Sequence, residues 1–301
     1  MSYHVLVPVD GSDRGFAALE YALASFPDAS ITALHVDDPR HDPGTGIGDS
    51  PPAEPPDDRE DRGVLERAAD RADESEHDGE FRTEQREGRP HAEILSVAAG
   101  DDDDRGVDHV VLGSHGTSPI DQPFLGRVSE AVVRRAPVTT TVVPESTDAI
   151  RERQFPGKVL VPVDGSEQST AALEYALATF PEAHHTAFHA LSLPVDRSRA
   201  GAEGTYLEKI LSAHEHRAGE LLGAATDLAD EYGATLETAT ADEKPAAAIV
   251  DYAETDEFDQ IVMGSHGRSL AARLLVGSVA ERVARRSPRT LTLVRGAPSS
   301  V

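Results

Sequence analysis

The chain spells the same eight residues, VLVPVDGS, at positions 5–12 and again at positions 159–166. The match continues beyond them, because AALEYALASF at 17–26 is answered by AALEYALATF at 171–180. The offset between the copies, 159 minus 5 or 154 residues, is far longer than the roughly 20–50 residues of a solenoid repeat. We therefore expect each copy to be a whole domain, since about 150 residues are enough to bury a hydrophobic core.

The two copies are joined by a linker and are unequal. The segment at 144–157 is polar and closes with Pro-Gly, which is typical of a linker, so we place the domains at 1–150 (copy 1) and 151–301 (copy 2). Copy 2 carries a long helical pattern at 204–234. Copy 1 has instead a Pro-, Gly- and Asp-rich stretch at 37–60, with so little apolar surface that we expect a mobile loop.

Acidic residues dominate the charge of the chain. There are 54 Asp and Glu against 28 Lys and Arg, which gives a formal net charge of −26. This balance argues against nucleic acids and anionic membranes as partners, since both are held mainly by Lys and Arg. Only three of the cations are lysines, and an acidic chain with so little Lys is similar to proteins of salt-loving archaea. The composition therefore predicts a halophilic, acidic surface and says nothing about activity.

The composition also bounds the cellular setting. The chain has no Cys, which excludes disulfides, thiol catalysis and zinc sites built on thiolates. Its first residues lack the basic and apolar regions of a signal peptide. No run approaches the ~18 apolar residues that a spanning helix needs. We therefore expect a cytoplasmic protein.

Short apolar runs rich in β-branched residues alternate with longer helical patterns in both copies. Such an order predicts a parallel sheet covered on both faces by helices, a doubly wound α/β fold. The runs are 4–9, 31–36, 109–114 and 138–143 in copy 1, and 158–163, 185–190, 260–265 and 289–294 in copy 2.

The repeated DGS predicts a turn followed by a helix. Ser12 and Ser166 are expected to be the N-caps of that helix. Pro8 and Pro162 donate no ladder hydrogen bond, so we expect them at the carboxyl ends of their strands. That edge is where ligands bind in open α/β sheets.

A glycine-rich segment follows the strand pattern at 260–265. Gly264 and Gly267 flank a tight loop, and Gly277 with Ser278 opens an amphipathic helix. A loop without Cβ atoms lets backbone N–H groups approach an anion, and a helix start offers unpaired N–H groups with a partial positive charge. Ser278 is expected to cap this helix and to donate its hydroxyl to a phosphate, with Arg268 as a nearby cation.

The G-x2-G-x9-G-[ST] spacing of these residues resembles the nucleotide-binding signature of the universal stress protein family. The resemblance includes the opening VPVDGS, the HV or HA that ends the second strand, and the closing apolar strand, and it covers the whole chain as two tandem copies. It implies that each domain is a five-stranded parallel sheet, of the adenine nucleotide alpha-hydrolase-like type, with an adenine nucleotide at its carboxyl edge. The implied ligand is ATP, or ADP or AMP, with or without Mg²⁺.

The resemblance also implies the site residues. Asp164 and the backbone near Ala190 would frame adenine and ribose, and the glycine segment would hold the phosphates. The implied nucleotide-binding residues are Asp164, Ala190, Gly264, Ser265, His266, Gly267, Arg268, Gly277, Ser278 and Val279 in copy 2, and Asp10, Val36, Gly113, Gly116 and Gly126 in copy 1. Family members commonly pair through the last strand, so the resemblance further implies an intrachain pseudo-dimer and association of two chains.

Copy 1 departs from the signature. Arg127 stands where Ser or Thr is expected, and the spacer before it contains Pro119 and Pro123, so it cannot form the helical pattern of copy 2. Arg127 would either pair with a phosphate or fill the site. We therefore expect tighter binding in copy 2.

Simpler interpretations stay open for several residues. Asp10 and Asp164 fit turn residues that bond their own backbone, and Tyr21 and Tyr175 fit the core. His115 and His266 fit loop contacts to solvent or ligand better than catalysis.

Metal binding is not favoured by the histidine pattern. His184, His185 and His189 lie around one strand, but His184 and His185 must point to opposite faces.

The function expected is that of a nucleotide-binding stress-response or regulatory protein. The first alternative is a slow ATPase or phosphotransferase in the same pocket, although no Walker lysine or general base is identifiable. The second is a structural partner protein that binds no nucleotide.

Overall fold

The computed structural model describes residues 3–38, 63–100, 106–114, 125–144, 150, 156–191, 204–265 and 276–295, with side chains in the last long helix described from residue 212 onward. The chain divides into two compact units, Met1–Glu152 (unit 1) and Arg153–Val301 (unit 2), which carry copy 1 and copy 2 of the repeat.

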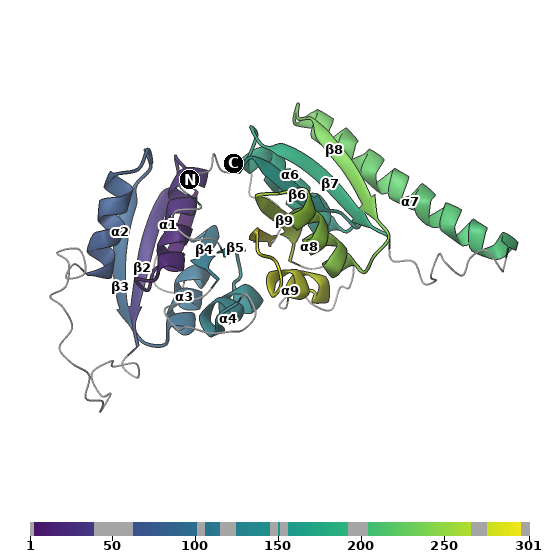
Figure 1. The fold of residues 1–301 in the computed structure, drawn as a ribbon. Coiled ribbons are helices and arrows are strands. Elements are labelled where there is room, and N and C mark those ends of the chain that lie inside the picture. The colour runs from purple at the N-terminus through teal and green to yellow at the C-terminus, as the bar shows by residue number, and fades with distance from the viewer. Residues whose placement is uncertain are drawn as a thin grey trace. The chain divides into compact units, whose positions relative to one another are not determined.

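Each unit is built around five strands with helices between them (Figure 1). The elements of unit 1 are β1 (His4–Pro8), α1 (Asp13–Ser25), β2 (Ser30–Asp37), α2 (Val64–Asp73), β3 (Phe81–Glu87), α3 (Pro90–Ala99), β4 (His109–Gly113), α4 (Arg127–Arg135) and β5 (Thr139–Val143). Those of unit 2 are β6 (Lys158–Pro162), α6 (Glu167–Thr179), β7 (His184–Ala190), α7 (Gly204–Glu231), β8 (Leu236–Ala241), α8 (Pro245–Thr255), β9 (Gln260–Gly264), α9 (Ser278–Ala284) and β10 (Thr290–Val294).

The strands are parallel, and their order is the same in both units. Unit 1 has the order β3-β2-β1-β4-β5, and unit 2 has the order β8-β7-β6-β9-β10. The register repeats as well, since Val5 is paired with Ile31 in unit 1 and Val159 with His185 in unit 2. The predicted doubly wound α/β fold is confirmed. Its order reverses between β1 and β4, and between β6 and β9, where crevices for ligands form in such sheets.

The apolar runs form the core as the pattern predicts. Val5, Leu6 and Val7 of β1 are each fully buried, and burying one such side chain contributes about 1.5–3 kcal/mol. Tyr21 and Tyr175 are buried and lie edge-on to Phe26 and Phe180, with ring centroids 6.4 and 6.2 Å apart. The core interpretation of the two tyrosines is therefore confirmed.

The edge strands β3 and β8 are absent from the runs expected above. Their sequences, FRTEQRE and LETATA, alternate exposed with half-buried side chains instead of forming continuous apolar runs. This is the pattern of a strand at the edge of a sheet, where one side of the strand stays polar.

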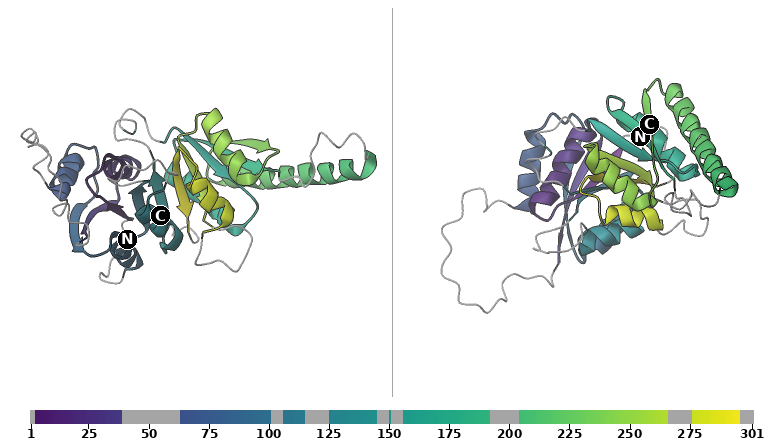
Figure 2. Two further views of the ribbon diagram at one scale, coloured as in Figure 1. Left: turned by 60° about the horizontal axis from the view of Figure 1, so that its bottom comes forward. Right: turned by 45° about the vertical axis from the view of Figure 1, so that its right-hand side comes forward.

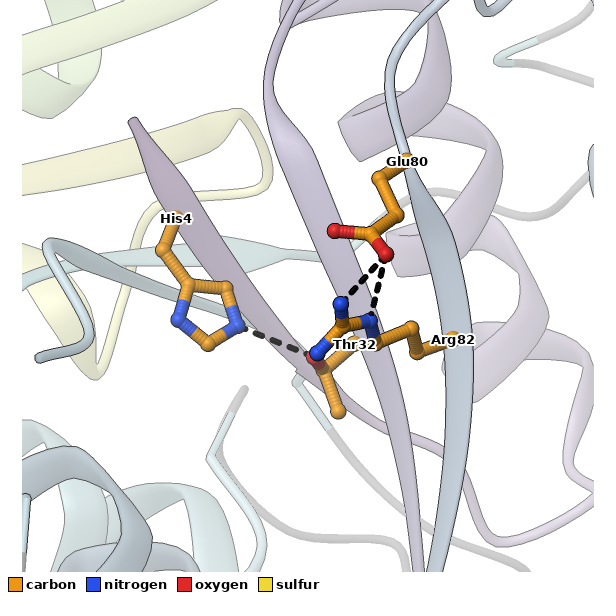
Figure 3. Close-up of polar contacts among 4 residues, drawn as sticks. All are labelled: His4, Thr32, Glu80 and Arg82. Carbon is orange, nitrogen blue, oxygen red and sulfur yellow. Dashed lines mark hydrogen bonds and ion pairs between the residues drawn. The ribbon is translucent and has the colours of Figure 1, made fainter. Parts of the chain in front are cut away.

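Polar side chains at the amino end of the unit 1 sheet satisfy one another (Figure 3). The Nδ1–H of His4 donates to the carbonyl of Gly106 at 3.2 Å, so Nε2 accepts from the hydroxyl of Thr32 at 2.9 Å. Arg82 on β3 forms an ion pair with Glu80. This edge therefore holds its polar groups in internal bonds.

The first residues of β4 and β9 are buried polar residues in equivalent positions. His109 is fully buried, with Nε2 2.8 Å from the hydroxyl of Thr141 and Nδ1 3.2 Å from that of Tyr3. Gln260 donates from Nε2 to the hydroxyl of Thr292 at 2.8 Å. Burial lowers the pKa of His109 to about 3.

Helix α7 is much longer than the strand that follows it. Its 28 residues extend about 42 Å at 1.5 Å each, whereas the six residues of β8 extend about 20 Å. Ala225 and Ala229 are buried against the core, and residues 212–224 carry mostly exposed side chains. Figures 1 and 2 show the helix running beyond the end of the sheet. Among the described residues, no helix is long and apolar enough to cross a membrane.

Candidate functional site

The turn after the first strand of each unit is held by an aspartate. Oδ1 of Asp10 accepts from the backbone N and the hydroxyl of Ser12, at 3.0 and 2.5 Å. In unit 2, Oδ1 of Asp164 accepts from the same two groups of Ser166, at 2.9 and 2.6 Å. Each serine is the N-cap of the helix that follows, as predicted. The turn role of Asp10 and Asp164 is therefore present, and it engages one carboxylate oxygen of each.

The strands themselves end where the sequence predicts. Pro8 and Pro162 are the last residues of β1 and β6. Gly11 follows with a φ of +82°, a left-handed conformation that favours glycine. The DGS turn thus lies at the carboxyl edge of each sheet.

A histidine at the end of the second strand fixes the end of the first strand. Nδ1–H of His35 donates to the carbonyl of Val9 at 2.8 Å, and Nδ1–H of His189 donates to that of Val163 at 2.7 Å. Val9 and Val163 are the residues just before the aspartates. The HV and HA that end the second strand in the sequence therefore carry a positioning contact that sequence reasoning missed, because it joins residues 26 positions apart.

Unit 1 adds an acidic partner to this histidine. Nε2 of His35 lies 3.2 Å from Oδ1 of Asp37, and Oδ2 of Asp37 accepts from Nε2 of Gln85 at 2.6 Å. Both ring nitrogens of His35 thus lie next to a protein group. In unit 2 the position after Ala190 is the buried Leu191. Val36 and Ala190 lie half-buried at the ends of β2 and β7.

The first glycine of the G-x2-G motif is required by packing. A Cβ on Gly113 would lie 2.6 Å from the carbonyl oxygen of Arg14, and one on Gly264 would lie 2.7 Å from that of Gln168. The first turn of α1 or α6 therefore rests directly on the strand end. Sequence reasoning assigned this glycine to anion approach, because the helix that touches it is distant in the chain.

The base of each glycine loop is closed by backbone hydrogen bonds. Gly126 N–H donates to the carbonyl of Ser114 at 2.6 Å, and Gly277 N–H donates to that of Ser265 at 2.7 Å. Both serines are almost fully buried, at 1% and 0% exposed. The amide of the last motif glycine is therefore engaged at the base of the loop, and the first amides of the helix beyond it stay available to an anion.

The helix that follows begins one residue earlier than predicted. Gly277 is the N-cap of α9 and Ser278 is its first residue, so the expectation that Ser278 caps this helix is wrong. Gly126 is likewise the N-cap of α4, and neither glycine offers a side chain to the helix amides. Ser278 is exposed at the helix start, with Val279 half-buried beside it. Its hydroxyl stays available at the surface for a ligand.

In unit 1 the same helix start carries a cation. Arg127 is the first residue of α4 and its side chain is exposed, which does not fit the expectation that it fills the site. Ser129 fixes the helix in place by donating its hydroxyl to the carbonyl of Gly113 at 2.7 Å.

Part of the predicted site lies outside the described residues. The predicted site residues outside the described ranges are Gly116, His115, Gly267, His266 and Arg268, and the prolines of the copy 1 spacer lie outside them as well.

Among the described residues, no cluster of His, Cys, Asp and Glu is arranged to hold a metal ion. His184 is exposed and His185 buried, so they point to opposite faces as the strand pattern predicts. Burial lowers the pKa of His185, whose Nε2 lies 3.1 Å from the carbonyl of Ala176.

Known proteins resemble the whole of this architecture. The model of a family described as the universal stress protein family matches residues 1–144 and again residues 156–295. A universal stress protein of Methanocaldococcus jannaschii is 33% identical over 127 residues, covering 42% of this chain and 74% of that protein. One of Mycobacterium bovis is 29% identical over 200 residues, covering 64% of this chain and 60% of that protein.

Solved structures extend the likeness to both units. The crystal structure of a universal stress protein from Archaeoglobus fulgidus has a TM-score of 0.57 and 21% identity, covering 98% of this chain and 99% of the other. One described as a putative universal stress protein from Pseudomonas aeruginosa has a TM-score of 0.62 and 15% identity, covering 98% and 93%. At these identities the likeness establishes the fold.

Proposed function

We propose that this chain, which belongs to the universal stress protein family, binds an adenine nucleotide and acts as a sensor or regulatory module. The nucleotide would lie at the carboxyl edge of each sheet. ATP is the ligand we favour, with ADP and AMP as the alternatives that a titration distinguishes.

The start of α9 is the observation that supports the proposal most directly. Its first amides have a glycine cap without a side chain, and the exposed hydroxyl of Ser278 stands beside them. Unpaired amides and the positive end of the helix dipole favour a phosphate at such a position. The buried base at Ser265, with its bond from Gly277, holds this helix start next to the crevice between β6 and β9.

The adenosine end of the ligand would lie at the turn beside β6. Asp164 is half-buried there, and one of its carboxylate oxygens already holds the turn. The bond from His189 to Val163 fixes the backbone on which Asp164 stands. A carboxylate held in this way is suited to accept a hydrogen bond from a ribose hydroxyl.

A thermal shift titration with ATP and Mg²⁺ in concentrated KCl tests the proposal. A ligand at 100 times its Kd adds about 2.7 kcal/mol to the free energy of unfolding. Ser278→Glu places a carboxylate where the phosphate would bind, while an acid in the first helical turn leaves the helix itself stable. We expect this variant to lose the tighter class of ATP sites in a calorimetric titration and to keep its melting temperature without ligand.

Ser212→Glu is the matched control, because Ser212 is an exposed helix residue of α7 and the charge change is the same. It should bind ATP as the unchanged chain does. A ligand-free, folded protein that shows no shift with ATP, ADP or AMP would contradict the proposal. Equal ATP binding by Ser278→Glu and Ser212→Glu would contradict the assignment of the site.

The enzymatic alternative is a slow ATPase in the same pocket. The sequence offers no identifiable general base at the phosphates, which argues against turnover. Steady phosphate release that Ser278→Glu abolishes and Ser212→Glu retains would favour this alternative.

A further inference from the structure

Three arginines surround the carboxyl edge of unit 1 where unit 2 has uncharged residues. Arg14 corresponds to Gln168, which follows the repeated turn in the same way, and Arg127 corresponds to Ser278 at the helix start. The third is Arg67, which precedes the buried Ala68 of α2. The residue before the buried Ala225 of α7 is Ala224.

Contacts place the three arginines on segments that meet the carboxyl ends of two adjacent strands. The backbone of Arg14 rests on Gly113 at the end of β4, and its Nε donates to the carbonyl of Pro144, just beyond β5, at 3.3 Å. Arg127 opens the helix whose Ser129 bonds the carbonyl of the same Gly113. Arg67 lies at the turn after β1, since its Nη2 lies 3.0 Å from where a Cβ on Gly11 would be. β1 and β4 are neighbours in the sheet, so Gly11 and Gly113 stand at the ends of adjacent strands.

These arginines differ from others in unit 1. Arg71 pairs with Glu20, Arg82 with Glu80 and Arg86 with Glu84. Within the described residues, Arg14, Arg67 and Arg127 form no such ion pair with a carboxylate. In a chain with nearly twice as many acidic as basic side chains, cations that have no acidic partner among the described residues, at the edge where we propose that a ligand binds, call for an explanation.

The placement of two of them is unfavourable for the isolated protein. Arg127 puts a positive charge at the positive end of the dipole of α4, which opposes stability unless an anion binds there. Nε of Arg67 is buried and has no hydrogen-bond partner in the described part of the chain. Its guanidinium carbon lies 4.9 Å from the centroid of the Phe16 ring, which holds the group beside the turn. Both features point to a negatively charged occupant.

Acidic groups also lie at this edge, including Asp37 at the end of β2. Asp10 lies in the turn with one oxygen engaged, and the exposed Asp13 precedes Arg14. Unit 2 has Asp164 and Glu167 at the same positions, so the carboxylates match while the three cations do not. Arg295 stands beyond β10 in unit 2, where burial lowers the pKa of its guanidinium.

We propose that unit 1 prefers a polyphosphate chain without a base, of three or more linked phosphates, which it binds through Arg14, Arg67 and Arg127 more tightly than it binds an adenine nucleotide, while unit 2 prefers the nucleotide. The inference rests on the proposed function of this edge and gives the two units different preferred ligands. Arginine suits the task because its planar donors form charge-assisted, bidentate hydrogen bonds with phosphate oxygens. A site built in this way binds chiefly through charge and needs no adenine.

Inorganic tripolyphosphate, which carries no base, is the probe. Its binding to the full chain is measured by calorimetry at several KCl concentrations. The double variant Arg14→Gln with Arg127→Ser gives unit 1 the residues that unit 2 carries at these positions. We expect its affinity for tripolyphosphate to fall at least about tenfold, the size expected from losing one charge-assisted hydrogen bond, and its salt dependence to weaken. Arg67→Met keeps the aliphatic stem on Phe16, removes the charge, and should weaken binding in the same direction.

Arg134→Gln is the matched control for charge, because Arg134 is exposed in the last turn of the same helix α4. It should bind tripolyphosphate as the unchanged chain does, and so should Ser278→Glu in unit 2. The proposal is overturned if the folded double variant binds tripolyphosphate as tightly as the unchanged chain, or if Arg134→Gln weakens binding equally. If tripolyphosphate does not bind, while ATP binds and Ser278→Glu weakens that binding, only this inference is contradicted. If no adenine nucleotide binds, the proposed function falls as well.

Discussion

Replacing His109 by glutamine should make unit 1 resistant to acid. His109 is fully buried, and burial lowers its pKa to about 3, far below the ordinary value of 6.5. Between these two values the unfolded chain binds a proton at this residue and the folded chain does not. The free energy of unfolding is therefore complete above about pH 6.5 and is lost as the pH falls toward 3.

The magnitude follows from the proton linkage. A group that is protonated only in the unfolded state costs about 1.36 kcal/mol for each pH unit below its unfolded pKa. At pH 4.5, two units below 6.5, the loss due to His109 is about 2.7 kcal/mol. Glutamine is the residue that unit 2 has at the same position, where Gln260 bonds Thr292 as His109 bonds Thr141. At pH 7.5 the variant should lose about 1 kcal/mol, because the contact with Tyr3 is removed.

The assay is urea unfolding by circular dichroism at pH 7.5 and pH 4.5. Hydrogen exchange of peptides from β1 and β4 assigns the transition to unit 1, since a two-unit chain need not unfold in one step. His109→Gln should be the less stable protein at pH 7.5 and the more stable one at pH 4.5. His216→Gln, at a side chain that is 79% exposed, should leave the pH dependence unchanged.

Subtracting the pH dependence of the unchanged chain from that of the variant cancels the contributions of other histidines, such as His77 and His185, whose pKa values burial also lowers. A His109→Gln variant with the same loss of stability between pH 7.5 and 4.5 as the unchanged chain would refute the reasoning.

Three further substitutions test the structural roles assigned above. Gly264→Ala should destabilise unit 2 by about 1–3 kcal/mol in thermal unfolding, because the new Cβ would lie 2.7 Å from a backbone carbonyl. Gly219→Ala is the control, because a Cβ there would have no atom within 4 Å, and it should be neutral or stabilising. An equal loss of stability in both variants would contradict the packing argument. Ser166→Ala removes the N-cap of α6 and should cost about 1 kcal/mol in denaturant unfolding, whereas Ser212→Ala should not. His189→Phe leaves the carbonyl of Val163 without its donor and should weaken ATP binding along with stability; unchanged ATP affinity would mean that the histidine only supports the fold.

Local signals in the sequence predicted the fold well. Continuous apolar runs and the DGS turn depend on residues next to one another, so the central strands and the caps Ser12 and Ser166 could be inferred from the letters alone. The edge strand β3 could not, because its polar alternation is as typical of a solvated segment. The repeat itself fixed the number of units, since two near-identical stretches must fold alike.

The candidate site was harder to predict because its reasons are not local. Position 113 requires a glycine because a Cβ there would clash with the carbonyl of Arg14, about a hundred residues away in the chain. His35 donates a hydrogen bond to the carbonyl of Val9, just beyond the neighbouring strand. The spacing of the glycines shows neither contact. The prediction for Ser278 was wrong by one residue, since Gly277 is the N-cap and Ser278 is the first helical residue. Glycine and serine are both favourable N-caps, so the sequence alone does not decide between them. The arginines around Gly11 and Gly113 come from three separate elements, which only the fold brings together.

The short bonds from Gly126 to Ser114 and from Gly277 to Ser265 have an evolutionary consequence. They enclose stretches of equal length that each begin at a buried serine, so we expect that the residues in between can change without moving the sheet or the helix beyond. After a gene duplication, the enclosed stretch of one copy can then change while the other copy keeps its sequence. Ligand preference and fold can then evolve separately. Replacing the residues between Ser114 and Gly126 with residues 266–276 would test whether ligand preference moves with this stretch.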